Sequence, residues 1–205
     1  MPMKFPARSG SADFEIAPAG NHVAICTGVI DLGLQPGSAM YPKPKHQVYI
    51  RFELPDETIT YTKDGKEQSG PMSIGRTFTA SMNEKANLRQ FIEGWFGKKF
   101  PSDEAAEDFD FAKLLGKRCL LNVTHTEKGE KTYANIGAAT PLPKSMPSEQ
   151  KQHNPSLFFS LSEPDPKAFS TLPEWLQKKI NGRISEEPEP AQPAAVADFD
   201  DEWPL

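Results

Sequence analysis

Apolar and polar residues alternate along several short stretches in the first two-thirds of the chain. The clearest stretch runs from Gln47 to Leu54, and strict alternation of this kind predicts a β-strand with one buried face. Its inward positions are Val48, Ile50, Phe52 and Leu54. Tyr49 and Arg51 are therefore expected to point outward, and Pro55 to end the strand.

Four further segments have strand character. The first, His22 to Leu34, is apolar on both faces around Gly28, which suits a long, bent strand that serves both halves of a small barrel. The others are predicted at Arg76 to Met82, Arg118 to His125 and Lys131 to Ile136. Residues 58–62, followed by Asp64 and Gly65, predict a short hairpin arm before the third strand.

One segment has a strong helical pattern. Its apolar residues are spaced at i, i+3, i+4 and i+7, as on one face of a helix: Leu88, Phe91, Ile92 and Trp95. We expect an N-cap at Ser81 or Asn83 and an end at Gly97. A second short helix or turn is expected within residues 102–115. Three strands, a helical insert and two strands are the order of a five-stranded OB-fold barrel, although another small barrel could share it.

The residues outside the predicted barrel form an N-terminal arm, a C-terminal extension, a linker and a tip. Prolines interrupt every period beyond residue 140, yet Leu157, Phe158, Phe159 and Leu161 are apolar. Trp175, Leu176 and Ile180 form a helical face. We predict an arm at 1–19, the barrel at 20–140, and an extension packed on the barrel at 141–184. Residues 185–197, rich in Glu, Pro and Ala, predict a disordered linker to a tip at 198–205.

Charge is distributed unevenly along the chain. The net charge is −5, but the last 21 residues hold seven acids and no base, so residues 1–184 carry 23 basic residues against 21 acidic ones. The body is therefore mildly basic and the acidity belongs to the tail. Without a long apolar run, the chain is expected to be cytoplasmic and not membrane-bound.

Enzymatic and metal-dependent chemistry finds little support in the sequence. Cys26 and Cys119 lie in apolar strands, where a thiol is usually a small buried hydrophobe. The four histidines have no metal-ligand spacing, and no phosphate-binding glycine loop or nucleophile elbow occurs. The acids of residues 103–110 are expected to cap a short helix. We expect neither catalysis nor a cofactor.

The last eight residues resemble the tip of bacterial single-stranded DNA-binding proteins. They are Asp198, Phe199, Asp200, Asp201, Glu202, Trp203, Pro204 and Leu205. That family has aspartates around a phenylalanine, then a proline and a terminal phenylalanine; Trp203 and Leu205 depart from it. The resemblance implies recruitment of replication, recombination and repair proteins. An acidic tail that only aids solubility is the alternative.

A second resemblance covers roughly residues 20–145. The stretches that carry it are Ser81 to Arg89, Trp95 to Phe100, Leu114 to Lys117 and Thr132 to Ile136. They are similar to a family of bacteriophage and prophage proteins from replication modules. Members of that family look like OB-type binders of single-stranded DNA, which implies the same role in a bacterial host cytoplasm.

A sequence-tolerant binder needs aromatic faces for bases and cations for phosphates along one groove. Strand parity and loop positions give these candidates for single-stranded DNA: Tyr41, Lys43, Lys45, Tyr49, Arg51, Tyr61, Arg76, Lys128, Lys131 and Tyr133. Any one tyrosine is equally well explained as a half-exposed sheet residue. The competing function is an adaptor that does not bind DNA and works through its acidic tail. The oligomeric state stays open.

Overall fold

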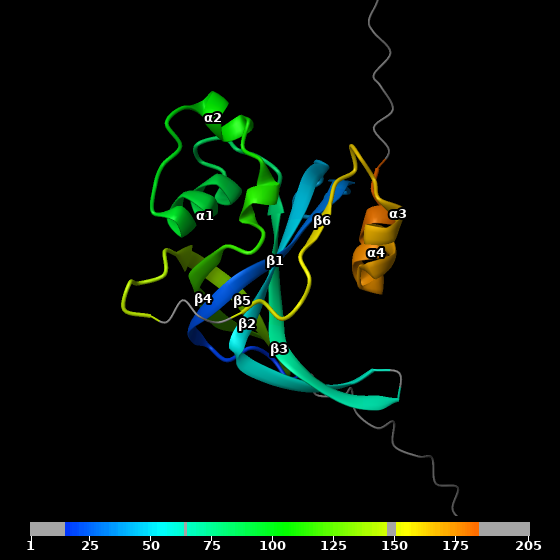
Figure 1. Ribbon diagram of the computed structural model, residues 1–205. Helices are drawn as coiled ribbons and strands as arrows, with labels where there is room; N and C mark the ends of the chain where they lie inside the picture. Colours follow the sequence, from blue (N-terminus) through cyan, green and yellow to red (C-terminus); the bar gives the residue numbers. More distant parts are fainter. Residues whose placement is uncertain (1–14, 64, 147–150, 185–205) are drawn as a thin grey trace, which may run out of the picture.

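The computed structural model describes residues 15–63, 65–146 and 151–184 (Figure 1). Its centre is an antiparallel sheet of five strands that curls into a half barrel, which confirms the predicted mainly β fold with a helical insert. The strands are β1 (Gly20–Gln35), β2 (Lys45–Lys63), β3 (Lys66–Thr79), β4 (Arg118–Lys128) and β5 (Lys131–Thr140). They lie in the order β3-β2-β1-β4-β5.

The long first strand takes part in both halves of the sheet, as its sequence predicts. Its first part pairs with β4 from Gly20 to Ile25, and its second part pairs with β2 from Ile25 to Gln35. The register shifts just before Gly28, where a Cβ atom would lie 3.3 Å from the Cβ atom of Arg51. A glycine at the bend therefore lets β1 turn between its two partners.

The second strand is longer than predicted, because Pro55 does not end it. The β2–β3 register shifts between Leu54 and Thr58, so Pro55 stands at an irregularity where its missing N–H costs no ladder hydrogen bond. Pairing resumes at Thr58 and continues to Lys63, which gives the predicted arm. This arm projects from the body of the sheet (Figure 1). Strand β3 begins at Lys66 and ends at Thr79, earlier than the predicted Met82.

The helical insert closes one end of the half barrel. Helix α1 (Asn87–Phe96) buries the four predicted apolar residues against the sheet and ends at Gly97 with a φ of 63°. The predicted cap is wrong: Ala86 is the N-cap residue, because the side chains of Ser81 and Asn83 instead accept hydrogen bonds in the preceding turn. Helix α2 (Asp103–Glu107) and the 3₁₀ helix η1 (Phe111–Leu114) follow.

Both cysteines belong to the core formed by the sheet and α1. Their side chains are fully buried, as predicted. Burial raises the pKa of the Cys26 thiol to about 12 and also raises the pKa of Cys119. Neither thiol is therefore a nucleophilic thiolate at neutral pH.

An arginine side chain spans the opening of the half barrel. Among the described residues, β3 and β5 face each other without a shared backbone ladder. Arg76 on β3 donates from Nη1 to the carbonyl oxygens of Ile136, at 3.0 Å, and Gly137, at 3.2 Å. Arg76 has the same strand parity as the buried Ile74 and Phe78, and its guanidinium reaches across the gap toward β5. Its expected contact with single-stranded DNA stays a prediction.

The C-terminal extension packs against β1. Strand β6 (Leu157–Phe159) pairs in parallel with residues 28–30 of β1. Helices α3 (Pro166–Thr171) and α4 (Glu174–Asn181) stand beside the sheet, on the other side from α1 and α2 (Figure 1). A second apolar cluster lies between these helices and the sheet. It is formed by Ile30, Leu32, Phe159, Leu172, Leu176 and Ile180. No helix of the described part is long and apolar enough to cross a membrane.

Candidate nucleic-acid interface

The outward row of β2 contains three of the candidate residues for single-stranded DNA, Lys45, Tyr49 and Arg51. Alternation places Lys45, Gln47, Tyr49, Arg51 and Glu53 on the side of β2 opposite the core. The predicted outward direction of Tyr49 and Arg51 is confirmed. The extension, however, packs along this same row. The side chains of the row therefore lie in different environments.

Tyr49 is half-buried in contact with α4. Its ring makes an edge-on contact with the ring of Trp175, with 5.1 Å between the centroids. Its hydroxyl end leans over Gly75 of β3, where any Cβ atom would clash with it. Burial raises the pKa of the Tyr49 hydroxyl. Contact with α4 therefore leaves Tyr49 only partly open, and its expected base-stacking role stays a prediction.

Arg51 and Glu53 are used to hold the structure together. Arg51 donates to the hydroxyl oxygen of Thr27 at 3.2 Å and to its carbonyl oxygen at 3.3 Å. The fully buried carboxylate of Glu53 accepts hydrogen bonds from the backbone N–H groups of His153, at 2.7 Å, and Asn154, at 2.9 Å, and from the Asn154 side chain. This part of β2 therefore anchors the extension.

The loop between β1 and β2 carries an exposed aromatic residue among cations. Tyr41 is 64% exposed, and the Nζ atom of Lys45 lies 5.6 Å from the centre of its ring. Ser38 and Tyr41 exchange backbone hydrogen bonds, which shape the loop, and Lys43 is exposed beside them. Aromatic and cationic groups in this arrangement suit bases and phosphates, respectively.

A second exposed group lies at the other end of β1. Tyr133 on β5 is 47% exposed beside a hollow of about 330 Å³ between β3 and β5, and the exposed Lys128 and Lys131 flank the nearby hairpin turn. Tyr61 on the β2–β3 arm is also exposed. Because Gln35 pairs with Lys45 at one end of β1 and Gly20 pairs with Val123 at the other, the predicted residues form two separated groups.

The sequence reasoning missed the aromatic residue on α4. Trp175 was assigned to a packed apolar face with Leu176 and Ile180, but it is 49% exposed while those two are buried. A signal was available in the spacing. Trp175 and Lys179 are four residues apart, which puts an aromatic residue and a cation on one side of α4, and Arg183 follows just beyond the end of the helix.

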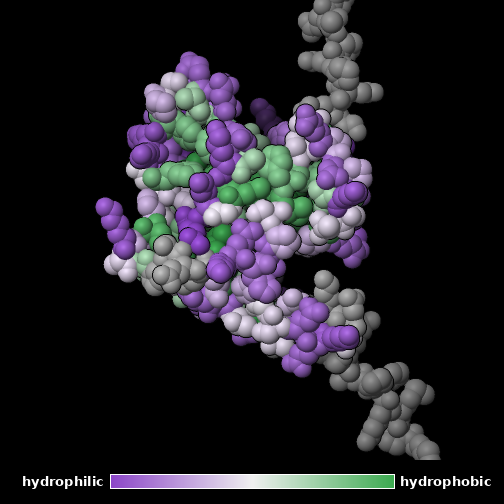
Figure 2. All heavy atoms as spheres, viewed as in Figure 1, coloured by the Kyte–Doolittle hydropathy of each residue, from purple (hydrophilic) through white to green (hydrophobic). Residues whose placement is uncertain are grey.

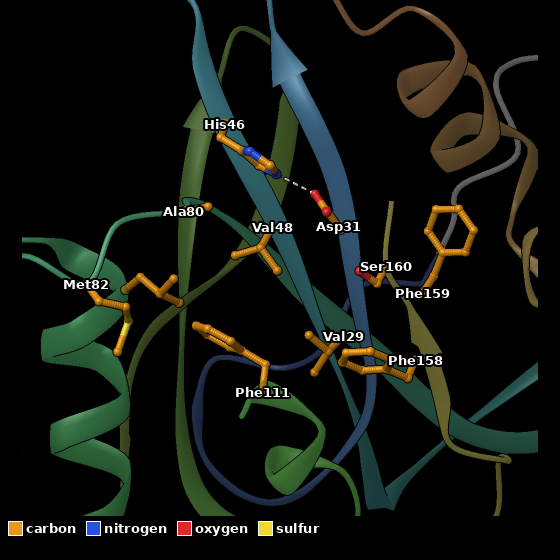
Figure 3. A pocket seen from close by; sticks show the side chains of 11 residues that line it. Val29, Asp31, His46, Val48, Ala80, Met82, Phe111, Phe158, Phe159 and Ser160 are labelled. Atoms are coloured by element: carbon orange, nitrogen blue, oxygen red, sulfur yellow. Dashed lines mark hydrogen bonds and ion pairs between the residues drawn. The ribbon is translucent and has the colours of Figure 1, made fainter. Parts of the chain in front are cut away.

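A separate apolar hollow of about 220 Å³ lies between the helical insert and β6 (Figure 3). Phe111, Phe158 and Met82 contribute to its walls, and apolar atoms gather on this part of the surface (Figure 2). At its rim, the Nε2 atom of His46 lies 2.6 Å from Oδ1 of Asp31.

The residues around this hollow do not form a catalytic triad. Ser160 lies on the far side of Asp31 from His46 (Figure 3), and its hydroxyl is hydrogen-bonded to that of Ser162 at 2.7 Å. Asp31 also accepts the backbone N–H groups of Gly33 and Leu161. Among the described residues no hydroxyl is hydrogen-bonded to His46. The His46–Asp31 contact joins β2 to β1, and Asp31 also holds the extension through Leu161.

Comparison with known proteins gives no relative: no protein-family model, curated protein or solved structure matches this chain. Within residues 15–63, 65–146 and 151–184, no three metal-ligating side chains come together. The predicted linker and tip, residues 185–205, lie outside the described residues. The fold and the exposed residues therefore carry the functional argument.

Proposed function

We propose that this chain is a sequence-tolerant single-stranded DNA-binding protein built on an OB-type barrel. The observation that carries the proposal is the strand order β3-β2-β1-β4-β5, with β1 shared between β2 and β4 and a helix between β3 and β4. This arrangement is typical of the OB-fold, whose β2–β3 side and neighbouring loops bind oligonucleotides.

The surface chemistry supports the same function. Tyr41 is mostly exposed next to Lys43 and Lys45, and Tyr133 is exposed near Lys128 and Lys131. A ring can stack on any of the four bases, and an ammonium group contacts the phosphate common to all nucleotides. Binding through these groups therefore tolerates sequence. In a phage, such a protein protects single strands during DNA replication, recombination and repair.

The decisive measurement is fluorescence polarisation of a labelled oligothymidine and of its duplex. We expect tighter binding to the single strand, and a fall in log K with log salt of about 0.7 per phosphate contact. The double variant Lys43→Ala/Lys45→Ala should flatten that slope by about 1.4, because two contacts are lost. Lys98→Ala, an exposed cation after α1, is the matched control. Equal affinity for single strand and duplex would contradict the proposal.

The acidic tip supplies the partner-binding part of the proposal. Deleting residues 198–205 is expected to leave DNA affinity unchanged or higher, because a tethered acidic segment competes weakly with phosphates for the same cations. The same deletion should abolish capture of replication, recombination and repair proteins in a pull-down from host extract. Severe loss of DNA binding with all partners retained would instead make the tip part of the DNA site.

One observation favours the adaptor as a second candidate. The apolar hollow of Figure 3 is open, and Phe158 at its edge is 43% exposed, which is more typical of a protein contact than of a DNA contact. An adaptor that works only through protein contacts would show no preference for the single strand in the polarisation experiment. The two candidates are therefore separated by the same measurement.

A further inference from the structure

We propose that Trp175 on α4 is the aromatic platform on which a DNA base stacks, and that Lys179, one helical turn later, and Arg183, just beyond the end of the helix, bind the adjoining phosphates. This inference rests on the proposed function and deepens it. It moves the stacking site of the β2–β3 face from the strand itself to the extension that packs against the strand.

Helix α4 contacts the outward row of β2 at two positions. Trp175 contacts the ring of Tyr49, and one helical turn later the Nζ atom of Lys179 donates to Oε1 of Gln47 at 3.2 Å. The carbonyl oxygen of Lys179 also accepts the side-chain amide of Gln35 at 3.1 Å. Helix α4 thus lies beside Tyr49, one of the residues of this row expected to meet DNA.

The indole of Trp175 is held in place without being buried. Leu176 and Ile180 fix the helix in the second apolar cluster, with 1% and 2% of their surface exposed. The edge-on contact with Tyr49 restrains the ring of Trp175, which remains half exposed. An exposed ring on a fixed helix loses little conformational entropy on binding, so it is well prepared for stacking.

The two cations beside Trp175 have no acidic partner in the described part of the chain. Partial burial lowers the pKa of Lys179, and Arg183 uses Nη1 for the carbonyl oxygen of Ile180 at 2.9 Å. Neither residue has a carboxylate within ion-pair distance among the described residues, whereas the neighbouring Lys178 pairs with Glu174 at 2.6 Å. A partly desolvated cation without a counter-charge is stabilised by a phosphate.

Two threonines of β3 pair with the β2 residues that α4 contacts. Thr77 lies opposite Tyr49, and Thr79 lies opposite Gln47. Farther along β2, Lys45 contacts the exposed ring of Tyr41. From Tyr49 to Lys45 the row covers about 13 Å at the rise of a β-strand. A single strand lying along this row would meet Trp175 first, then Lys179, and then the β1–β2 loop.

Intrinsic fluorescence tests the stacking role in the full chain. The chain has three tryptophans, so a Trp203→Phe background leaves the buried Trp95 and the exposed Trp175. Titration with unlabelled oligothymidine should quench this background strongly, and adding Trp175→Phe should remove the quenching while polarisation still reports binding, because phenylalanine also stacks. Trp175→Ala should weaken binding on the order of ten-fold. Urea midpoints check that each variant is folded.

The adjacent lysines provide a matched pair for the phosphate role. Lys179→Ala should reduce the salt slope by about 0.7, the value of one contact, while Lys178→Ala should leave the slope unchanged. Persistent quenching in the Trp175→Phe variant, with Trp175→Ala binding like wild type, would overturn the inference and leave the proposed function standing. Failure of the wild-type chain to bind oligothymidine would overturn both.

Discussion

Replacing Trp95 with alanine is expected to lower the free energy of unfolding by about 4 kcal/mol, which is the cost of emptying a large aromatic site in a core. Trp95 is 2% exposed, and its ring contacts Phe52 at 5.2 Å and Phe91 at 6.3 Å between centroids. Its Nε1 atom also donates to the carbonyl oxygen of Arg118 at 2.9 Å. The single residue therefore joins helix α1 to β2 and to the start of β4.

Urea unfolding followed by circular dichroism measures this loss. Phe96→Ala is the matched control, because Phe96 is the next residue of the same helix and stacks on Trp95 but is 38% exposed. We expect the control to lose roughly 1 kcal/mol. Similar losses in the two variants would mean that α1 does not close the core through Trp95.

Replacing Glu53 with alanine is expected to cost about 3 kcal/mol, because it removes the buried acceptor of a charged hydrogen-bond network. The carboxylate is fully buried and accepts three hydrogen bonds from His153 and Asn154. Without the carboxylate, the backbone N–H groups of His153 and Asn154 and the Asn154 side-chain amide lose their acceptor. The attachment of the extension to β2 should weaken in consequence.

Two measurements separate local from global effects of the Glu53 variant. Urea unfolding gives the total loss, and limited proteolysis reports whether residues 141–184 are cleaved before the barrel. Glu57→Gln is the control, since Glu57 is partly exposed and pairs with His22 at 3.0 Å, and its loss should stay below about 1 kcal/mol. An unchanged midpoint for Glu53→Ala would show that the extension is held by its apolar cluster alone.

Local patterns in the sequence predict much of the fold. Alternation from Gln47 to Leu54 fixes which side chains of β2 enter the core, and the i, i+3, i+4, i+7 spacing ending at Gly97 fixes the buried face of α1. These features depend on the periods of strand and helix, which each segment carries by itself. The apolar character of both faces of β1 likewise indicates a strand with two partners.

Local patterns give wrong predictions at positions whose environment depends on segments distant in the sequence. A proline ends a strand only where the ladder needs a backbone N–H at that position. The shift in β2–β3 register removes that need at Pro55. Ser81 lies too far before the helix to cap it. Arg76 has the parity of a core residue, and only the position of β5 across the gap explains how its charge is accommodated.

The candidate site shows the same division. The sequence alone determined that aromatic and cationic residues share the outward row of β2 and the loop before it, since strand parity and composition are local properties. Only the tertiary structure decided which of them a ligand can reach. Tyr49 is half-buried and Trp175 is exposed because the extension, more than 100 residues away in the chain, buries Leu176 and Ile180 against β1 and places its helix beside the strand. Periodicity shows that a side chain leaves the core side, but what then covers it is a long-range contact that no local pattern encodes.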